Sequence, residues 1–186
     1  MEGLKIIPQV FFDLIARVIP GSVSIVAYLL LFKQSWESLM QNIMGSSFTA
    51  SHTSIIFVIF LGTAFVMGEL LSPFAKFLQR RTENKPFKKF EKEDGLYDKL
   101  RLNHAYVGSL CAKIRAEFTM HNGLSAVFAI SAIYYPFSAA AWHWYILVIL
   151  IGMTLITLIR AHDTNETFNK TVIKFSKAAG YEIKVK

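Results

Sequence analysis

The chain has 186 residues, of which 53% are hydrophobic and 18% are charged, and its formal net charge is +7. Such an apolar composition argues against an ordinary soluble domain, while the charged fraction leaves room for polar segments outside a membrane. The single cysteine excludes an intramolecular disulfide, and no metal-ligand spacing surrounds it, so neither a disulfide framework nor a metal site is expected.

Four apolar segments are each close to the ~20 residues that a helix needs to cross the hydrocarbon core. These segments are Leu14–Phe32, Thr53–Leu71, Phe118–Tyr135 and Trp142–Ile159. Four crossings place both termini on the same side of the membrane. The sequence therefore predicts an all-α fold, in which four transmembrane helices carry cytoplasmic helical extensions and both termini are cytoplasmic.

The distribution of basic residues gives the orientation. Of the 20 Lys and Arg residues, all but Lys33 lie on the side where this topology places both termini, with Arg17 just inside the first span at that end. Since loops rich in Lys and Arg stay in the cytoplasm, that side is expected to be cytoplasmic. The chain then divides into residues 1–71 with the first two spans, 72–117 as a basic loop and amphipathic helix, 118–159 with the last two spans, and 160–186 as a cytoplasmic helix and tail. At the other side, Tyr134, Tyr135, Trp142, Trp144 and Tyr145 are expected at the head-group level.

Ionisable residues recur near the cytoplasmic ends of the spans, where they form a candidate gate or charge network. They are Asp13, Arg17, Glu69, Glu117, His121 and Arg160. Asp13 and Arg17 are four residues apart, a spacing that favours an ion pair on one helix face. Two interpretations remain open: side chains that reach water from the helix ends, or charge pairs that hold a pore closed.

Small residues indicate where the spans approach each other. Ala64 and Gly68 form a small-xxx-small pair that Gly62 would widen, and Ser125 and Ala129 form a second pair. Ordinary helix packing explains such pairs, although a pore lining or subunit interface uses the same residues.

The segment between the second and third spans carries the candidate ligand-binding residues. They are Arg80, Arg81, Lys85, Lys88, Lys89, Lys92, Arg101, Lys113 and Arg115, with Phe87 and Phe90 available for stacking on bases. Basic residues interleaved with aromatic ones suit a nucleotide or oligonucleotide. Acidic residues in the same run leave a solvated loop and contact with anionic lipid as alternatives.

Apolar residues at helical spacing continue through the same segment. They are Leu96, Leu100, Val107, Cys111, Ile114 and Phe118. The spacing predicts one helix from Gly95 to Tyr135, about 60 Å long. Its exposed stripe needs cover, and the candidates are the second span extended to Arg81, a short C-terminal helix around Phe168, Val172 and Phe175, or another subunit.

Arg115 and His121 have the spacing of the nuclease signature of HEPN ribonucleases, and they resemble it by spacing only. No nucleophile elbow, phosphate-cradling glycine loop or paired-acid constellation accompanies them. The sequence therefore predicts a protein that is not an enzyme and needs no cofactor.

Three stretches carry a family resemblance: Phe-Phe-Asp-Leu-Ile-Ala-Arg-Val-Ile-Pro-Gly at 11–21, Met-Gly-Glu-Leu-Leu-Ser at 67–72 and Ala-Lys-Ile-Arg-Ala-Glu-Phe-Thr-Met at 112–120. They resemble small bacterial inner-membrane effectors of anti-phage defence, of the Hailong type, with the Kiwa membrane subunit as the rival. The resemblance implies a homo-oligomer, such as a tetramer, that acts as a channel-like effector. A nucleotide or short single-stranded DNA would regulate it, and its operon would encode a soluble partner.

Two other functions remain open from the residues. A non-conducting sensor or scaffold would use the exposed stripe to recruit a soluble partner. A small multidrug carrier is the third hypothesis, weakened by the lack of an acidic residue near the membrane centre.

Overall fold

The computed structural model describes residues 3–32, 38, 53–82, 96–138 and 143–180. Within these ranges the chain forms helices α1 (Gly3–Phe32), α3 (Thr53–Thr82), α5 (Leu96–Asn103), α6 (Ala105–Tyr134) and α7 (Trp144–Ala178), with the short 3-10 helix η1 (Tyr135–Phe137) after α6. The predicted all-α class is confirmed.

Three helices are long and apolar enough to cross a membrane, over Val10–Phe32, Ile56–Leu78 and Trp144–Ala178. This supports a multi-pass membrane protein. The α6 helix is not among the three. It carries Asn122, Ser125 and Ser131, all buried against neighbouring helices, in the part where a span was expected.

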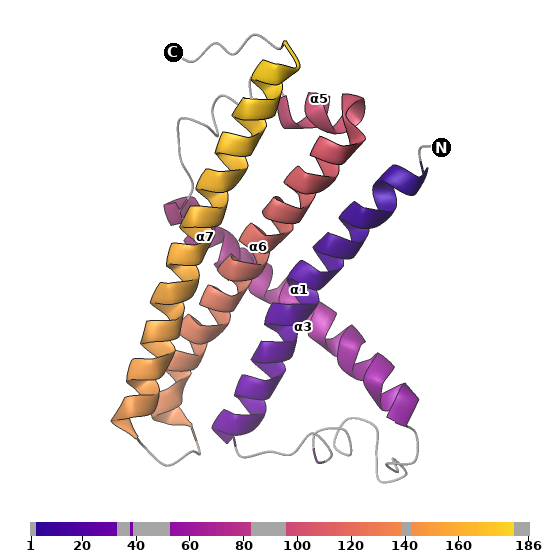
Figure 1. Cartoon of the computed structure of the whole chain (residues 1–186). Coiled ribbons are helices and arrows are strands. Elements are labelled where there is room, and N and C mark those ends of the chain that lie inside the picture. Colours follow the sequence, from indigo (N-terminus) through magenta and orange to yellow (C-terminus); the bar gives the residue numbers. More distant parts are fainter. Residues whose placement is uncertain (1–2, 33–37, 39–52, 83–95, 139–142, 181–186) are drawn as a thin grey trace.

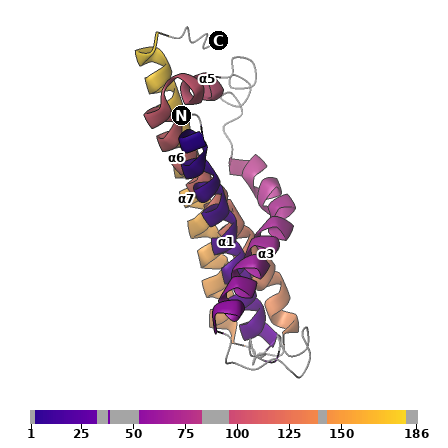
Figure 2. The same cartoon turned by 90° about the vertical axis from the view of Figure 1, so that its right-hand side faces the viewer.

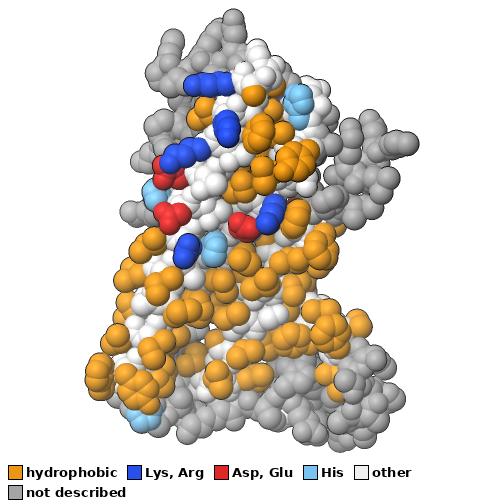
Figure 3. All heavy atoms as spheres, in the orientation of Figure 1, with side chains coloured by type: hydrophobic (Ala, Val, Ile, Leu, Met, Phe, Trp, Pro, Cys, Tyr) orange, Lys and Arg blue, Asp and Glu red, His pale blue; other side chains and the backbone are white. Residues whose placement is uncertain are grey.

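The helices form an elongated bundle. The α6 and α7 helices run antiparallel side by side, α1 lies alongside α6, and α3 crosses behind α1 (Figures 1 and 2). The start of α1, the whole of α5 and the last turns of α7 lie at one end, which we call the polar end. The turn between α6 and α7 lies at the other. Charged side chains gather toward the polar end, and hydrophobic side chains cover most of the remaining described surface in this view (Figure 3).

Glycines bring the backbones of α1 and α3 into direct contact. A Cβ added at Gly21 would lie 1.7 Å from the carbonyl oxygen of Ala64, and one added at Gly68 would lie 2.2 Å from that of Arg17. The predicted role of Ala64 and Gly68 in close helix approach is therefore confirmed. Gly62 does not extend this contact, because a Cβ there would meet no atom within 4 Å.

The turn that joins α6 to α7 is held by Tyr135. Its side chain is buried, and its hydroxyl accepts a hydrogen bond from the His143 backbone N–H at 2.8 Å and donates one to the His143 carbonyl at 3.2 Å. Tyr135 was expected at the head-group level together with Tyr134 and Trp144; its side chain is instead buried, whereas those of Tyr134 and Trp144 are exposed. Within the hairpin, Ser125 donates to the Thr157 hydroxyl at 2.8 Å.

The predicted continuous helix from Gly95 to Tyr135 is wrong, because the chain breaks at His104 (φ −132°, ψ 86°). The break turns α5 across the polar end (Figure 1). Tyr97 and Leu100 then join Val107, Cys111 and Ile114 of α6 and Phe168 and Val172 of α7 in one buried cluster. We call these seven residues the polar-end core. A straight helix would have left the same apolar side chains in water, so their burial favours the break.

Of the three candidates for covering the stripe, the C-terminal residues Phe168 and Val172 do so, but they do not belong to a separate short helix. They lie in the last third of α7, which continues without interruption from the apolar segment. Gly180 follows with φ +76°, the left-handed conformation expected after a helix end. The α3 helix reaches Thr82, as expected, although none of its residues belongs to the polar-end core.

Candidate functional site

An ion pair links α1 to α3 next to their backbone contact. The Arg17 guanidinium bonds to the Glu69 carboxylate, and the two side chains are 44% and 40% exposed. The guanidinium also lies over the Phe65 ring, 5.8 Å from its centroid. Arg17 lies one helical turn before Gly21, and Glu69 directly follows Gly68, so both partners lie next to a glycine of the contact.

The expected pair between Asp13 and Arg17 is not formed. Among the described residues, the other ion pairs join Lys113 to Glu117 and Lys170 to Glu166, each within one helix. Glu69 reaches Arg17 because the glycine contact brings α1 and α3 together. The carboxylate that pairs with Arg17 therefore comes from the neighbouring helix and not from Asp13 on the same helix.

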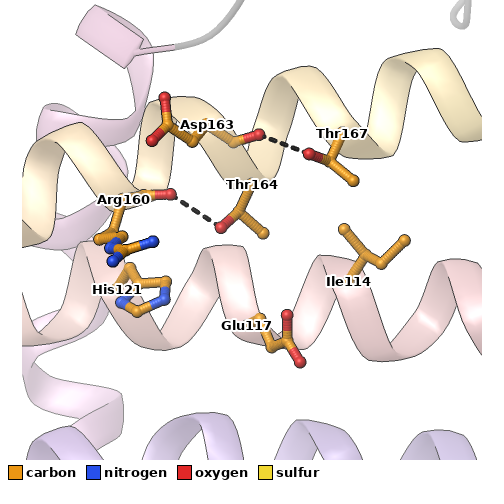
Figure 4. Close-up of a pocket in the computed structure, with 7 residues that line it drawn as sticks. All are labelled: Ile114, Glu117, His121, Arg160, Asp163, Thr164 and Thr167. Atoms are coloured by element: carbon orange, nitrogen blue, oxygen red, sulfur yellow. Dashed lines mark hydrogen bonds between the residues drawn. The ribbon is translucent and has the colours of Figure 1, made fainter.

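A hollow of about 290 Å³ opens between α6 and α7. Its lining residues are Ile114, Glu117, His121, Arg160, Asp163, Thr164 and Thr167 (Figure 4). It therefore contains three members of the predicted charge network, Glu117, His121 and Arg160. The structure brings these three together and places the Arg17–Glu69 pair elsewhere, on the α1–α3 side.

Charges of both signs line the hollow. The Arg160 side chain reaches from α7 toward α6 and lies next to the His121 ring, whereas the Asp163 carboxylate points away from α6 (Figure 4). None of the ion pairs formed within the described ranges uses Arg160, His121 or Asp163. Glu117 has Lys113 at 3.9 Å, near the limit for an ion pair and on a solvent-exposed face.

The hydroxyl groups in the hollow are already committed as donors. Thr164 donates to the Arg160 carbonyl at 2.7 Å and Thr167 to the Asp163 carbonyl at 2.9 Å (Figure 4). A hydroxyl has one hydrogen to donate, so these oxygens can only accept further hydrogen bonds. Sequence reasoning missed Thr164 and Thr167 as site residues. The signal was their spacing of four and seven residues from Arg160, which places them on one face of α7.

The remaining predicted ligand-binding residues are only partly placed. Arg80, Lys113 and Arg115 are exposed, at the end of α3 and on α6. Arg81 lies in the last turn of α3 and Arg101 in α5. The other basic and aromatic candidates, Lys85, Phe87, Lys88, Lys89, Phe90 and Lys92, lie outside the described residues.

Arg115 and His121, which have the ribonuclease spacing, contact different neighbours. The Arg115 guanidinium lies over the Tyr97 ring of α5, 5.5 Å from its centroid, whereas His121 lies beside Arg160 in the hollow. The described side chains thus do not form the joint Arg and His site that this signature needs. No group of three or more His, Cys, Asp or Glu side chains that could hold a metal ion occurs in the part of the chain that the structure describes.

Asn122, next to the hollow, has a buried polar atom without a partner. Its amide nitrogen donates to the Phe118 carbonyl at 3.0 Å, but its Oδ1 atom accepts no hydrogen bond, and the side chain is 1% exposed. An unsatisfied buried acceptor destabilises a fold by about 1–3 kcal/mol.

We therefore expect Asn122→Leu to raise the stability of the detergent-solubilised protein by about 1 kcal/mol, measured as the midpoint of thermal unfolding. Ser176→Ala is a second test at the polar end, because the Ser176 hydroxyl is also buried without a partner. Both variants should stabilise the protein. A fall in the midpoint for Asn122→Leu would mean that the amide oxygen is satisfied in the membrane-embedded protein.

Comparison of the chain with protein-family models, with curated proteins and with solved structures found no match. The class of the molecule, a helical multi-pass membrane protein, therefore follows from its own helices and surface.

Proposed function

We propose that α6 is the fourth membrane span and that the polar end faces the cytoplasm of a bacterial inner membrane. The charge distribution of the sequence supports this orientation, because the basic residues of α6 and α7 outside their apolar segments lie toward the polar end. The Ser125 hydroxyl, which lowers the hydropathy of α6, is satisfied within the bundle by Thr157, and this makes it compatible with a membrane interior.

Within that membrane the chain would act as a homo-oligomeric, channel-like effector. The observation that carries this proposal is the Arg17–Glu69 pair at the backbone contact of α1 and α3. An ion pair at the boundary between apolar and charged surface is suited to hold two helices in one arrangement until another charge competes for either partner. Since Gly21 and Ala64 touch, ions cannot pass between α1 and α3. We therefore place the conducting path between copies of the chain.

The signal in this proposal is a nucleotide or short single-stranded DNA that binds the basic polar end, and the outcome is loss of membrane integrity in anti-phage defence. Exposed Arg80, Lys113 and Arg115 supply cationic surface there. The defence role and the chemical nature of the signal rest on the family resemblance of residues 11–21, 67–72 and 112–120.

The scaffold hypothesis is less favoured, because it needed an exposed apolar stripe. Leu100 and Cys111 of that stripe are each 0% exposed and Val172 covers them from α7. A soluble partner would therefore have to recognise other surfaces.

Ion flux through liposomes that contain the purified protein tests the proposal. We expect low basal flux from the wild type and at least tenfold higher flux when a short single-stranded DNA or a cyclic nucleotide is added. Glu69→Gln removes one charge of the α1–α3 pair and should raise flux without any ligand. Lys88→Glu combined with Lys89→Glu should abolish the response to ligand while oligomer size stays constant.

Glu166→Gln is the control for Glu69→Gln, because it also removes a paired carboxylate but from an exposed turn of α7. Its basal flux should equal that of the wild type. A correctly assembled wild-type oligomer that conducts under no condition would overturn the channel proposal.

A further inference from the structure

The hollow between α6 and α7 opens at the level where the apolar surface of α7 ends. Ile156 and Ile159 are exposed by 55% and 61%, and the next residue, Arg160, lines the hollow. In a membrane-embedded protein this is the depth at which lipid head groups meet the helices. A ligand here can extend hydrocarbon along α7 and keep its polar part in the hollow.

The charges in the hollow are ordered along the helix axes. His121 and Arg160 lie nearest the apolar surface, whereas Glu117 lies four residues closer to the polar end on α6. Four residues of a helix correspond to about 6 Å. A phospholipid head group with a primary amine has the same order, because its phosphate is attached to the lipid backbone and its ammonium lies farther from the hydrocarbon.

Hydrogen-bond donors and acceptors follow the same order, because the donors of the hollow lie nearest the apolar surface and the acceptors lie closer to the polar end. The Arg160 guanidinium carries only donors, and His121 has at least one ring N–H to donate, which suits phosphate oxygens. The hydroxyl oxygens of Thr164 and Thr167 can only accept, as their hydrogens are bonded to carbonyl groups of α7. Together with the Glu117 carboxylate, they suit a group that carries several N–H donors.

We propose that the hollow binds the head group of a membrane aminophospholipid, with its phosphate against Arg160 and His121 and its primary ammonium against Glu117, Thr164 and Thr167. This inference rests on the membrane placement of α6 and α7 proposed above, and it does not depend on conduction. The site would discriminate by the N–H donors of the ammonium. Phosphatidylcholine lacks these donors, and phosphatidylglycerol lacks the amine.

Binding is measured on the delipidated full-length protein by native mass spectrometry, with phosphatidylethanolamine, phosphatidylcholine and phosphatidylglycerol of identical acyl chains. We expect the ethanolamine lipid to bind about tenfold more tightly than either of the others, as one charge-assisted hydrogen bond would give. Glu117→Gln should remove the preference for ethanolamine over choline and leave binding of phosphatidylglycerol unchanged. Arg160→Gln should weaken the binding of all three lipids.

Glu166→Gln and Lys174→Gln are the matched controls, since both change exposed charges of α7 that do not line the hollow. Both should bind as the wild type does. Unchanged phosphatidylglycerol binding by Glu117→Gln would show that this variant folds. Equal wild-type affinity for the three lipids, or wild-type selectivity in Glu117→Gln, would overturn the proposal.

Soluble phosphoethanolamine separates a membrane ligand from a free one. At equal concentration it should not displace the lipid, because it lacks the acyl chains that lie along α7. Displacement would assign the hollow to a soluble ligand and overturn the lipid proposal. Lipid selectivity in a protein that conducts no ions would support the head-group site and reject the channel. Failure of the lipid proposal can therefore be told apart from failure of the channel proposal.

Discussion

Gly21→Ala is expected to destabilise the membrane domain by about 3 kcal/mol, at the upper end of the usual effect of overpacking. The new methyl group would lie 1.7 Å from the Ala64 carbonyl oxygen and 2.9 Å from the Gly68 nitrogen, and both atoms belong to the backbone. No side-chain rotation can relieve that overlap, so α1 and α3 must separate and the neighbouring Arg17–Glu69 pair must stretch. The midpoint of thermal unfolding in detergent measures the effect.

Gly62→Ala and Gly152→Ala are the controls for this variant, because a Cβ at either position meets nothing within 4 Å. Alanine favours a helix over glycine by about 0.5–1 kcal/mol, so both controls should match or exceed the wild-type midpoint. A Gly21→Ala protein as stable as these two would show that α1 and α3 do not cross at this contact in solution.

Leu100→Asp is expected to release α5 from the polar end, with a loss of about 4 kcal/mol of local stability. The Leu100 side chain is 0% exposed within the polar-end core, so the change removes buried apolar contacts and places a carboxylate in an apolar site. Hydrogen exchange should accelerate in α5 and in the last turns of α7, while the apolar parts of α6 and α7 keep their protection.

Lys99→Asp is the matched control, because it introduces the same carboxylate at the adjacent, exposed position of α5. Its exchange pattern should resemble that of the wild type. If Leu100→Asp instead leaves α5 protected and dissociates the proposed oligomer, the stripe is a subunit interface and the polar-end core is wrong.

The sequence predicted the features that depend on pattern within one segment. Apolar length identified the helices, and the Ala64 and Gly68 spacing identified the face of α3 that meets α1. The segment around Phe168 and Val172 was one of three candidates for the cover of the stripe. Each follows from helix periodicity, which a chain displays before any tertiary contact is known.

Features that depend on two distant segments were missed or misassigned. Neither proline nor glycine lies beside His104, and Asn103 is only a weak local signal for a helix end. The burial of Tyr97 and Leu100, which favours the break, depends on distant residues of α6 and α7. Arg17 was paired with Asp13 because helix spacing offered that partner, whereas Glu69 becomes available only through the glycine contact. The sequence did not predict the hollow as a site, because Thr164 and Thr167 carry no charge.

The α6–α7 pair and the α1–α3 pair are held together by different kinds of contact. The Tyr135 hydroxyl ties the α6–α7 hairpin at one end and the aromatic and aliphatic cluster around Leu100 ties it at the other, so these helices form a stiff frame. The described contact of α1 with α3 centres instead on glycine backbones. The α1 and α3 helices are therefore joined where two backbones touch, whereas the α6–α7 pair is joined at both of its ends.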